Sequence, residues 1–289
     1  AIKKILITGA NGFIGGSLMR YYQNHGQDVV GVDLIGNGND IVEGDVSQPN
    51  TISQQLQECD VIIHTAALVS NAMQDSDMWQ VNVLATRNLI QAAKEHKVRR
   101  FVQISSIVAY GNSAEGELDE THPVHADGGS YVLTKLASEH VVLSEQANDD
   151  IEVVIIRPGD AYGPGSRPWI IAPLEAIAKN QFMLPEKGEG FFRPIYIDDL
   201  VRGIAMASKH PDADGEIFNL SCEGYMFTKD YFTPHYQWLG KKRPMVVSTN
   251  LALKISAIAS KLADLIGNLN EASPSTVKQL STKSWFSIK

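Results

Sequence analysis

Residues 5–15 read Ile-Leu-Ile-Thr-Gly-Ala-Asn-Gly-Phe-Ile-Gly, and this stretch decides the fold. Its first four residues are apolar or β-branched and predict a buried strand, whereas the residues after Gly12 have the apolar spacing of a helix. Gly9 permits a tight turn between the two, Gly12 lets the backbone approach a phosphate, and Gly15 allows the helix to pack closely on the strand. Because a helix N-terminus offers free N–H donors, the stretch predicts a site for the pyrophosphate of a dinucleotide.

Short apolar runs alternate with longer helical patterns through the first part of the chain. The strand candidates are Ile5–Thr8, Val29–Val32, Val61–His64, Phe101–Ile104 and Val153–Ile156, and the helix candidates are Gly12–His25, Asp77–His96 and Ser130–Gln146. Such alternation is typical of parallel strands joined by helices. The predicted fold class is therefore α/β, with a doubly wound parallel sheet.

The composition changes after Pro158 to Pro, Gly and aromatic residues, and the strand-helix rhythm stops, which indicates a second, smaller lobe. Residues 194–207 return to strand-then-helix character. We therefore expect residues 1–165 to form the dinucleotide-binding domain, with residues 194–220 returning to it. Residues 166–193 and 221–289 are expected to form a substrate-binding lobe.

Asp33 ends the second predicted strand, eighteen positions after Gly15. A carboxylate there can accept hydrogen bonds from both hydroxyls of the adenosine ribose and would repel a 2′-phosphate. Residues 34–39 contain no Arg or Lys that could bind such a phosphate. These features favour NAD over NADP, and the alternative is that Asp33 is a solvated turn residue.

Tyr131 and Lys135 lie four residues apart in a predicted helix, so a phenol and an ammonium share one face. We expect nearby positive charge to lower the pKa of the phenol. With the oxidised nicotinamide adding a second positive charge, Tyr131 could take a proton from a substrate hydroxyl near neutral pH. The spacing alone is a weak signal. Ser105 and Ser106 strengthen it, because they follow the strand candidate that precedes this helix.

A series of linked motifs resembles the extended short-chain dehydrogenase/reductase family, and the resemblance runs through almost the whole chain. In order, the motifs are Thr8-Gly9-Ala10-Asn11-Gly12-Phe13-Ile14-Gly15, Gly44-Asp45-Val46, His64-Thr65-Ala66-Ala67, Val81-Asn82-Val83, Ser105-Ser106 before Tyr110-Gly111, Tyr131-Val132-Leu133-Thr134-Lys135, and Arg157-Pro158 before Tyr162-Gly163-Pro164-Gly165. The resemblance implies a Rossmann-type first domain, NAD as cofactor and hydride transfer at a secondary alcohol or ketone.

The resemblance also implies a role for individual residues. Ser106 would hydrogen-bond the reacting oxygen, Tyr131 would be the acid and base, and Lys135 would also hold the nicotinamide ribose. The implied cofactor-binding residues are Gly9, Asn11, Gly12, Phe13, Ile14, Gly15, Asp33, Asp45, Val46, Ala66, Ala67, Tyr131, Lys135 and Pro158. Without the resemblance, Ser106 is only a strand-end hydroxyl, and His64 is better explained as a satisfied core histidine than as a catalyst.

The substrate is less well defined by the sequence. Sugar dehydratases of this family carry Asp-Glu directly after the catalytic Ser or Thr, whereas Ile107 and Val108 stand here, which argues against a dehydratase. Nucleotide-sugar epimerases usually bind the diphosphate through an arginine seven residues before an aspartate, and counting back from Asp199 gives Phe192. Arg193 is adjacent, but strand alternation would point it to the opposite face. The candidate substrate residues are Tyr162, Arg167, Trp169, Phe192 and Arg193, with Lys187 as a further cation; the aromatic ones are more often core residues.

Three functions remain as alternatives. The leading one is an NAD(H)-dependent oxidoreductase acting on a secondary alcohol or ketone, and the second is a nucleotide-sugar epimerase that retains its NAD. The amphipathic, apolar-rich run Leu251–Leu269 resembles the steroid and dihydroflavonol branch and fits an apolar substrate pocket, unless it packs the lobe or a dimer. The third is a non-catalytic NAD-binding scaffold on the same fold, against which the intact Ser106, Tyr131 and Lys135 argue.

Composition limits the partners and the location of the protein. With 44% hydrophobic and 20% charged residues, the chain is typical of globular proteins, and a net charge of −8 without a basic run argues against nucleic-acid binding. Cys59 and Cys222 are far apart, which indicates a reducing compartment and no metal site. We expect a cytoplasmic protein without a signal peptide or membrane span, although surface contact stays open. The resemblance implies a homodimer through Asp77–His96 and Ser130–Gln146.

Overall fold

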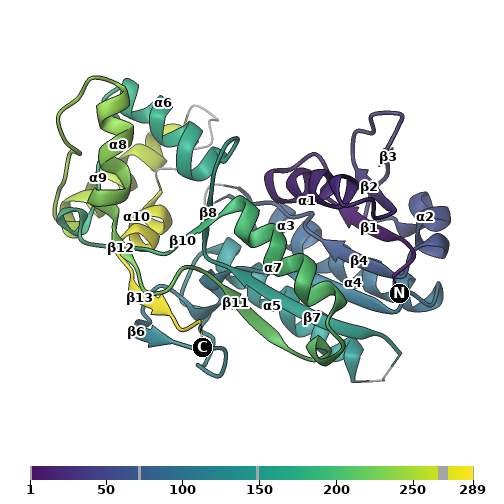
Figure 1. Ribbon diagram of the computed structural model, residues 1–289. Coiled ribbons are helices and arrows are strands. Elements are labelled where there is room, and N and C mark those ends of the chain that lie inside the picture. Colours follow the sequence, from purple (N-terminus) through teal and green to yellow (C-terminus); the bar gives the residue numbers. More distant parts are fainter. Residues whose placement is uncertain (1, 71–72, 148–149, 266–272, 289) are drawn as a thin grey trace.

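The computed structural model describes residues 2–70, 73–147, 150–265 and 273–288. Its main feature is a seven-stranded sheet in the order β11-β7-β5-β4-β1-β2-β3, in which all neighbouring strands are parallel (Figure 1). The strands are β1 (Ile5–Thr8), β2 (Val29–Asp33), β3 (Ile41–Glu43), β4 (Val61–His64), β5 (Arg100–Ile104), β7 (Glu152–Pro158) and β11 (Ile217–Leu220). The predicted Rossmann-type α/β fold is confirmed.

Helices cover both faces of this sheet. They are α1 (Phe13–Asn24), α2 (Ser53–Glu58), α3 (Asp75–Trp79), α4 (Ala85–Glu95), α5 (Ser130–Gln146) and α7 (Ile197–Lys209). Alternate residues of a strand point to opposite faces, so Ile5 and Ile7 pack in one core cluster with residues of α1 and α7, and Leu6 packs in another with residues of α2, α4 and α5. Two covered faces explain why the strands are almost continuously apolar.

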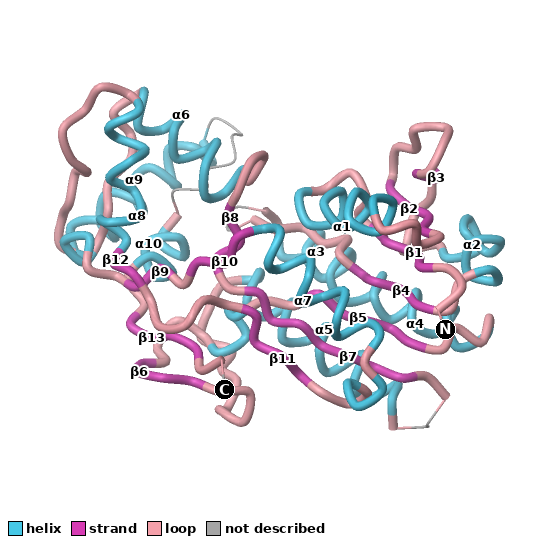
Figure 2. The backbone as a smooth tube through the Cα atoms, viewed as in Figure 1, coloured by secondary structure: helices cyan, strands magenta, loops and turns pink. Residues whose placement is uncertain are grey.

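The remaining elements form a smaller lobe and its connections, drawn on the left of Figure 2. The helices of this part are α6 (Ala172–Ala178), α8 (Thr228–Trp238), α9 (Thr249–Leu265) and α10 (Pro274–Leu280), and the strand pairs are β8 (Asp160–Tyr162) with β10 (Pro194–Tyr196), β9 (Phe191–Phe192) with β12 (Met226–Phe227), and β6 (Glu115–Leu118) with β13 (Lys283–Phe286). A separate core cluster joins Leu184, Phe192 and Leu280 to two aromatic residues of α8.

Two predicted segments differ in detail from the structure. The single helix expected over Asp77–His96 is α3, a π-helical turn at Gln80–Leu84, and α4. The strand expected at the start of residues 194–207 is β10, which pairs with β8 outside the main sheet. The chain returns to the main sheet through α7, which packs on α1, and through β11, which pairs with β7.

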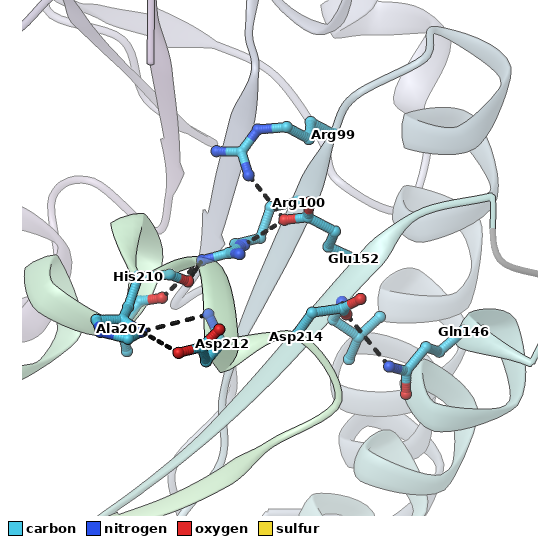
Figure 3. Close-up of polar contacts among 9 residues, drawn as sticks. Arg99, Arg100, Gln146, Glu152, Ala207, His210, Asp212 and Asp214 are labelled. Carbon is cyan, nitrogen blue, oxygen red and sulfur yellow. Dashed lines mark hydrogen bonds and ion pairs between the residues drawn. The ribbon is translucent and has the colours of Figure 1, made fainter. Parts of the chain in front are cut away.

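Arg100 anchors α7 at the amino end of the sheet. Its guanidinium is fully buried, binds Glu152 at 2.7 Å, and donates hydrogen bonds to the carbonyl oxygens of Ala207 and His210 at 2.9 and 2.8 Å (Figure 3). Carbonyl groups at the end of a helix lack intrahelical partners and carry partial negative charge, so a cation there is favourable. The C-terminal end of α7 is thereby fixed at the amino ends of the strands, whereas the candidate site lies at their carboxyl ends.

The apolar run Leu251–Leu269 begins in α9, and its last four residues lie outside the described residues. In the described parts of the chain, no helix has both the length and the apolar character needed to cross a bilayer.

Candidate active site

The glycine loop, residues 9–15, connects β1 to α1. Gly9 has φ +66°, and a Cβ atom there would lie 2.8 Å from the backbone nitrogen of Ala66. A Cβ on Gly15 would collide with the carbonyl oxygen of Gly9. Gly12 is the N-cap of α1 and makes no side-chain cap, so the first N–H groups of the helix remain available to a ligand. The loop therefore fits a pyrophosphate group on its backbone.

Asp33 is held beside the glycine loop at the end of β2. Its Oδ2 atom accepts a hydrogen bond from the Asn11 N–H at 2.9 Å, and its Oδ1 atom accepts one from the Leu34 N–H at 2.8 Å. The Asn11 side chain donates to the Ile35 carbonyl at 2.7 Å and ties the two loops together. Each carboxylate oxygen can accept a further hydrogen bond, so the arrangement fits a ribose diol.

The other predicted cofactor residues lie at the carboxyl ends of neighbouring strands. Ala66 and Ala67 follow β4, and the Ala66 N–H donates to Thr8 Oγ1 at 3.3 Å. Pro158 ends β7 and is buried, and Asp45 and Val46 follow β3. In parallel sheets, ligands bind outside the carboxyl ends of the strands, where the strand order reverses. The structure thus brings these predicted residues to the carboxyl ends of the strands, where the glycine loop also lies.

The two serines after β5 have different surroundings. The Ser105 hydroxyl donates to the buried carboxylate of Glu139. The Ser106 hydroxyl accepts from the Val108 N–H at 3.3 Å and hydrogen-bonds with the side chain of Tyr131. Only Ser106 is therefore placed with Tyr131, as the resemblance implied.

Tyr131 lies in the first turn of α5. Burial raises the pKa of its phenol to about 12, the hydrogen bond with Ser106 lowers it, and the negative charge of Asp160 raises it. The expectation that nearby positive charge lowers this pKa is wrong for the protein side chains alone, because the desolvation of the phenolate has the larger effect, whereas the contribution expected of the nicotinamide stays a prediction. The phenol therefore stays protonated at neutral pH.

Lys135 lies one turn further along α5, and its side chain is buried. Its Nζ atom donates to the carbonyl oxygen of Ile104, the last residue of β5, at 3.0 Å. Burial lowers the pKa of the ammonium to about 8, and the negative charge of Glu139 raises it. The lysine is therefore mostly charged at neutral pH. Its ammonium lies close to the end of β5, two residues before Ser106.

Glu139 and Arg157 form a buried ion pair beneath these residues, which the sequence analysis missed. Both side chains are only 3% exposed, and Glu139 Oε2 lies 2.7 Å from Arg157 Nη2. A second contact joins Arg157 Nε to Oε1 at 3.0 Å, and the guanidinium also lies over the Tyr110 ring. The sequence did contain one sign that Glu139 belongs to the site, because it follows Lys135 by one helical turn and so lies on the same face of the helix.

His64 is the satisfied core histidine that was expected. Its Nδ1 lies 2.7 Å from Thr8 Oγ1 and its Nε2 lies 2.9 Å from Thr86 Oγ1. Burial, together with the positive charge of Lys135, lowers the pKa of its imidazole to about 3. The ring is neutral, and both of its nitrogens are used by the core.

Asn82, in the π-helical turn, connects the site to its surroundings. Its amide accepts from the Leu68 N–H at 2.8 Å and donates to the Leu68 carbonyl at 3.0 Å. It also donates to Thr134 Oγ1 at 3.1 Å. These bonds hold the chain after β4 against the turn of α5 that contains Tyr131 and Lys135.

Two of the predicted substrate residues are buried and have partners within the protein. Phe192 is 1% exposed and stacks on Tyr231 with ring centroids 3.7 Å apart. Arg193 is 4% exposed, pairs with Asp160 at 3.1 Å and donates to Thr282 Oγ1 at 2.8 Å. Phe192 has no charge to offer a diphosphate, and Arg193 would leave the buried carboxylate of Asp160 without a partner if it bound one instead.

The other three predicted substrate residues are less enclosed. Arg167 is exposed and lies 3.6 Å from Glu175, which makes it the most available cation of the set. Trp169 packs edge-on against Phe192, and Tyr162 packs edge-on against Tyr196. The structure therefore does not join these five residues into one polar pocket.

Replacing Lys135 by Met is expected to stabilise the fold by about 1–3 kcal/mol at pH 7 and to abolish activity. Its folded pKa of about 8 is below the ordinary value of 10.5, a difference that corresponds to about 3 kcal/mol against the charged folded state. This penalty is complete below pH 8 and fades between pH 8 and 10.5, because the unfolded state binds more protons there. Urea unfolding from pH 6 to 10 should show the stability difference shrinking above pH 8. A variant less stable than the wild type at pH 7 would contradict the argument.

The chain is similar to several known proteins. Residues 5–221 match the model of the NAD dependent epimerase/dehydratase family. The chain is 26% identical to the decarboxylating sterol-4-alpha-carboxylate 3-dehydrogenase of Candida albicans, over 82% of this chain and 73% of the relative. It is also 26% identical to the 2-alkyl-3-oxoalkanoate reductase of Stenotrophomonas maltophilia, over 99% of this chain and 92% of the relative.

Solved structures give a similar result. UDP-glucuronic acid 4-epimerase from Bacillus cereus in complex with NAD superposes with a TM-score of 0.74 at 26% identity, covering 85% of this chain and 87% of the epimerase. The relatives thus include oxidoreductases as well as an epimerase.

Proposed function

The chain belongs to the NAD-dependent epimerase/dehydratase family, and from this membership we propose that it is an NAD(H)-dependent oxidoreductase of a secondary alcohol or ketone. It is an enzyme of the extended short-chain dehydrogenase/reductase type. The observation that carries the proposal is the hydrogen bond between Ser106 and Tyr131, with Lys135 one turn along the same helix. A serine, a phenol and an ammonium in this order suit proton transfer to and from a reacting oxygen.

NAD is the cofactor, and the residues at the sheet edge fit it. The backbone of the glycine loop would hold the pyrophosphate, Asp33 the adenosine ribose, and Lys135 the nicotinamide ribose. When bound, the oxidised cofactor supplies a hydride acceptor and a positive charge, and the reduced form supplies a hydride.

The side chains supply the proton chemistry. Ser106 would donate a hydrogen bond to the substrate oxygen and hold it against the Tyr131 hydroxyl. Tyr131, protonated at neutral pH, is ready to give its proton to a ketone oxygen as that oxygen gains charge. In the direction of oxidation, Lys135 would stabilise the phenolate that forms when Tyr131 takes the proton of an alcohol.

The direct test is a screen for NAD reduction with sterols, flavanols and nucleotide sugars. The near-ultraviolet absorbance of NADH is the readout. An oxidoreductase gives a stoichiometric absorbance change with its alcohol. The alternative of a nucleotide-sugar epimerase is favoured by the likeness to UDP-glucuronic acid 4-epimerase. It would show NAD retained through purification and no net absorbance change, and the buried pairing of Arg193 argues against it.

NAD is expected to bind at least tenfold more tightly than NADP, which corresponds to about 1.4 kcal/mol. A 2′-phosphate would lie beside the Asp33 carboxylate, so like-charge repulsion would add to the loss of ribose hydrogen bonds. Asp33→Ala should shrink the preference, and Asp33→Ala with Leu34→Arg should reverse it. Fluorescence titration of both reduced cofactors measures the ratio. Asp40→Ala is the matched control, because Asp40 binds Asn37 and Gln23 instead. Equal wild-type affinities would refute the role of Asp33.

We also infer the homodimer and the cytoplasmic location that the sequence analysis suggested. Trp79 and Leu84, in the segment Asp77–His96 expected at the interface, are 40% and 43% exposed. Large apolar side chains exposed on adjacent turns support a protein contact there. Sedimentation velocity at micromolar concentration tests the dimer.

A further inference from the structure

Helix α9 carries an apolar stripe that faces solvent. The stripe consists of Leu251, Ile255, Ile258 and Leu262, which are 47%, 38%, 62% and 59% exposed. Because an α-helix turns about 100° per residue, these four side chains fall within an arc of about 60° and extend about 16 Å along the helix. Ala252, which is buried, points to another side of the helix. The exposed residues therefore form one continuous surface.

The segment of sequence that carries this stripe is basic, whereas the whole chain is acidic. The carboxylate of Glu186 binds Thr249 within this segment, and Asp264 follows the segment in the sequence. Residues 239–263 contain five cations, Lys241, Lys242, Arg243, Lys254 and Lys261, and no Asp or Glu, whereas the net charge of the chain is −8. Lys254 and Lys261 are exposed and lie about 70–90° from the middle of the stripe, both on the same side. Neither forms an ion pair with another described side chain.

We propose that α9 docks the protein on an anionic lipid surface. An amphipathic helix binds in the plane of a membrane by burying its apolar side chains at the headgroup boundary while flanking lysines contact lipid phosphates. The stripe and its lysines have this arrangement. The acidic residues elsewhere do not prevent binding, because charges more than about 8–10 Å from the surface are screened at physiological salt.

A second copy of the chain fits this surface less well. Antiparallel symmetric pairing of two α9 helices would bury both stripes but would gather Lys254 and Lys261 of both copies on one side of the contact, with no carboxylate in residues 239–263 to offset them. Like charges in such positions are unfavourable. A lipid surface provides both the apolar layer and the negative charge.

The proposal is tested by co-sedimentation of the full chain with phosphatidylcholine vesicles and with vesicles in which about a third of the lipid is phosphatidylglycerol. We expect binding to the anionic vesicles that weakens at high salt, and little binding to the neutral ones. Ile258→Gln with Leu262→Gln, or Lys254→Gln with Lys261→Gln, should weaken the binding about tenfold or more. Met206→Gln is the matched control, because Met206 is 73% exposed but lies on α7.

Further measurements separate the outcomes. All four replaced positions are exposed, so circular dichroism and thermal unfolding should match the wild type, and NADH binding should be unchanged. Failure of the wild type to bind anionic vesicles, or unchanged binding of both double variants, would overturn the proposal. Sedimentation velocity tests whether the stripe is a dimer contact instead. If the wild type is a dimer and Ile258→Gln with Leu262→Gln dissociates it, the stripe serves self-association and the proposal is overturned.

Discussion

Replacing Tyr131 by Phe is expected to lower turnover at least a hundredfold and to leave the affinity for NAD nearly unchanged. The substitution removes the hydroxyl that carries the proton and keeps the ring, and general acid–base catalysis contributes about 10²–10⁴-fold. The substitution also removes the hydrogen bond between Tyr131 and the Ser106 hydroxyl. Steady-state turnover and NAD titration of the same preparation separate chemistry from binding.

The control for this variant is Tyr21→Phe. Tyr21 lies on α1 and packs on His25 rather than on the residues of the candidate site. Its replacement should leave turnover within about twofold of the wild type. Near-normal turnover of Tyr131→Phe would remove Tyr131 from the mechanism.

Replacing Arg157 by Met is expected to destabilise the fold by about 3–5 kcal/mol, because it leaves the carboxylate of Glu139 buried without its cation. Total stabilities are about 5–15 kcal/mol, so this single change would remove a large part of the folding free energy. The measurement is urea unfolding of the variant and the wild type at neutral pH.

Two further variants identify the cause. Adding Glu139→Met to Arg157→Met removes both charges and should restore much of the loss, which a double-mutant cycle quantifies. Arg202→Met breaks the pair with Asp199, whose side chains are 65% and 55% exposed, and should cost less than about 1 kcal/mol. If Arg157→Met were as mild as Arg202→Met, the buried pair would have no special role.

Much of the first domain was predictable because its signals are local. The apolar runs and helical patterns predicted β1, β4 and α5 with the bounds that the structure has. In a sheet covered on both faces, strands are continuously apolar and short, so they contrast clearly with amphipathic helices. The glycine loop was equally local, since it depends on the spacing of three residues.

The remaining features depend on contacts between distant residues. The π-helical turn is held by the bonds of Asn82 to Leu68 and Thr134, the latter 52 residues away. The pairing of Arg193 with Asp160 cannot be read by counting along a strand, because it joins residues 33 positions apart. The pKa of Tyr131 was misjudged for a related reason, since charges can be counted in a sequence but burial cannot.

The late return of the chain to the main sheet has a consequence for synthesis on the ribosome. Strand β7 acquires its outer neighbour only when β11 emerges, after the intervening residues 159–216 have been translated. Until then the unpaired N–H and C=O groups along β7 form an open edge, to which another nascent chain could add a strand. Vectorial folding therefore leaves this edge open while residues 166–193, the first part of the second lobe, are being made, and protection by a chaperone would matter most in that interval.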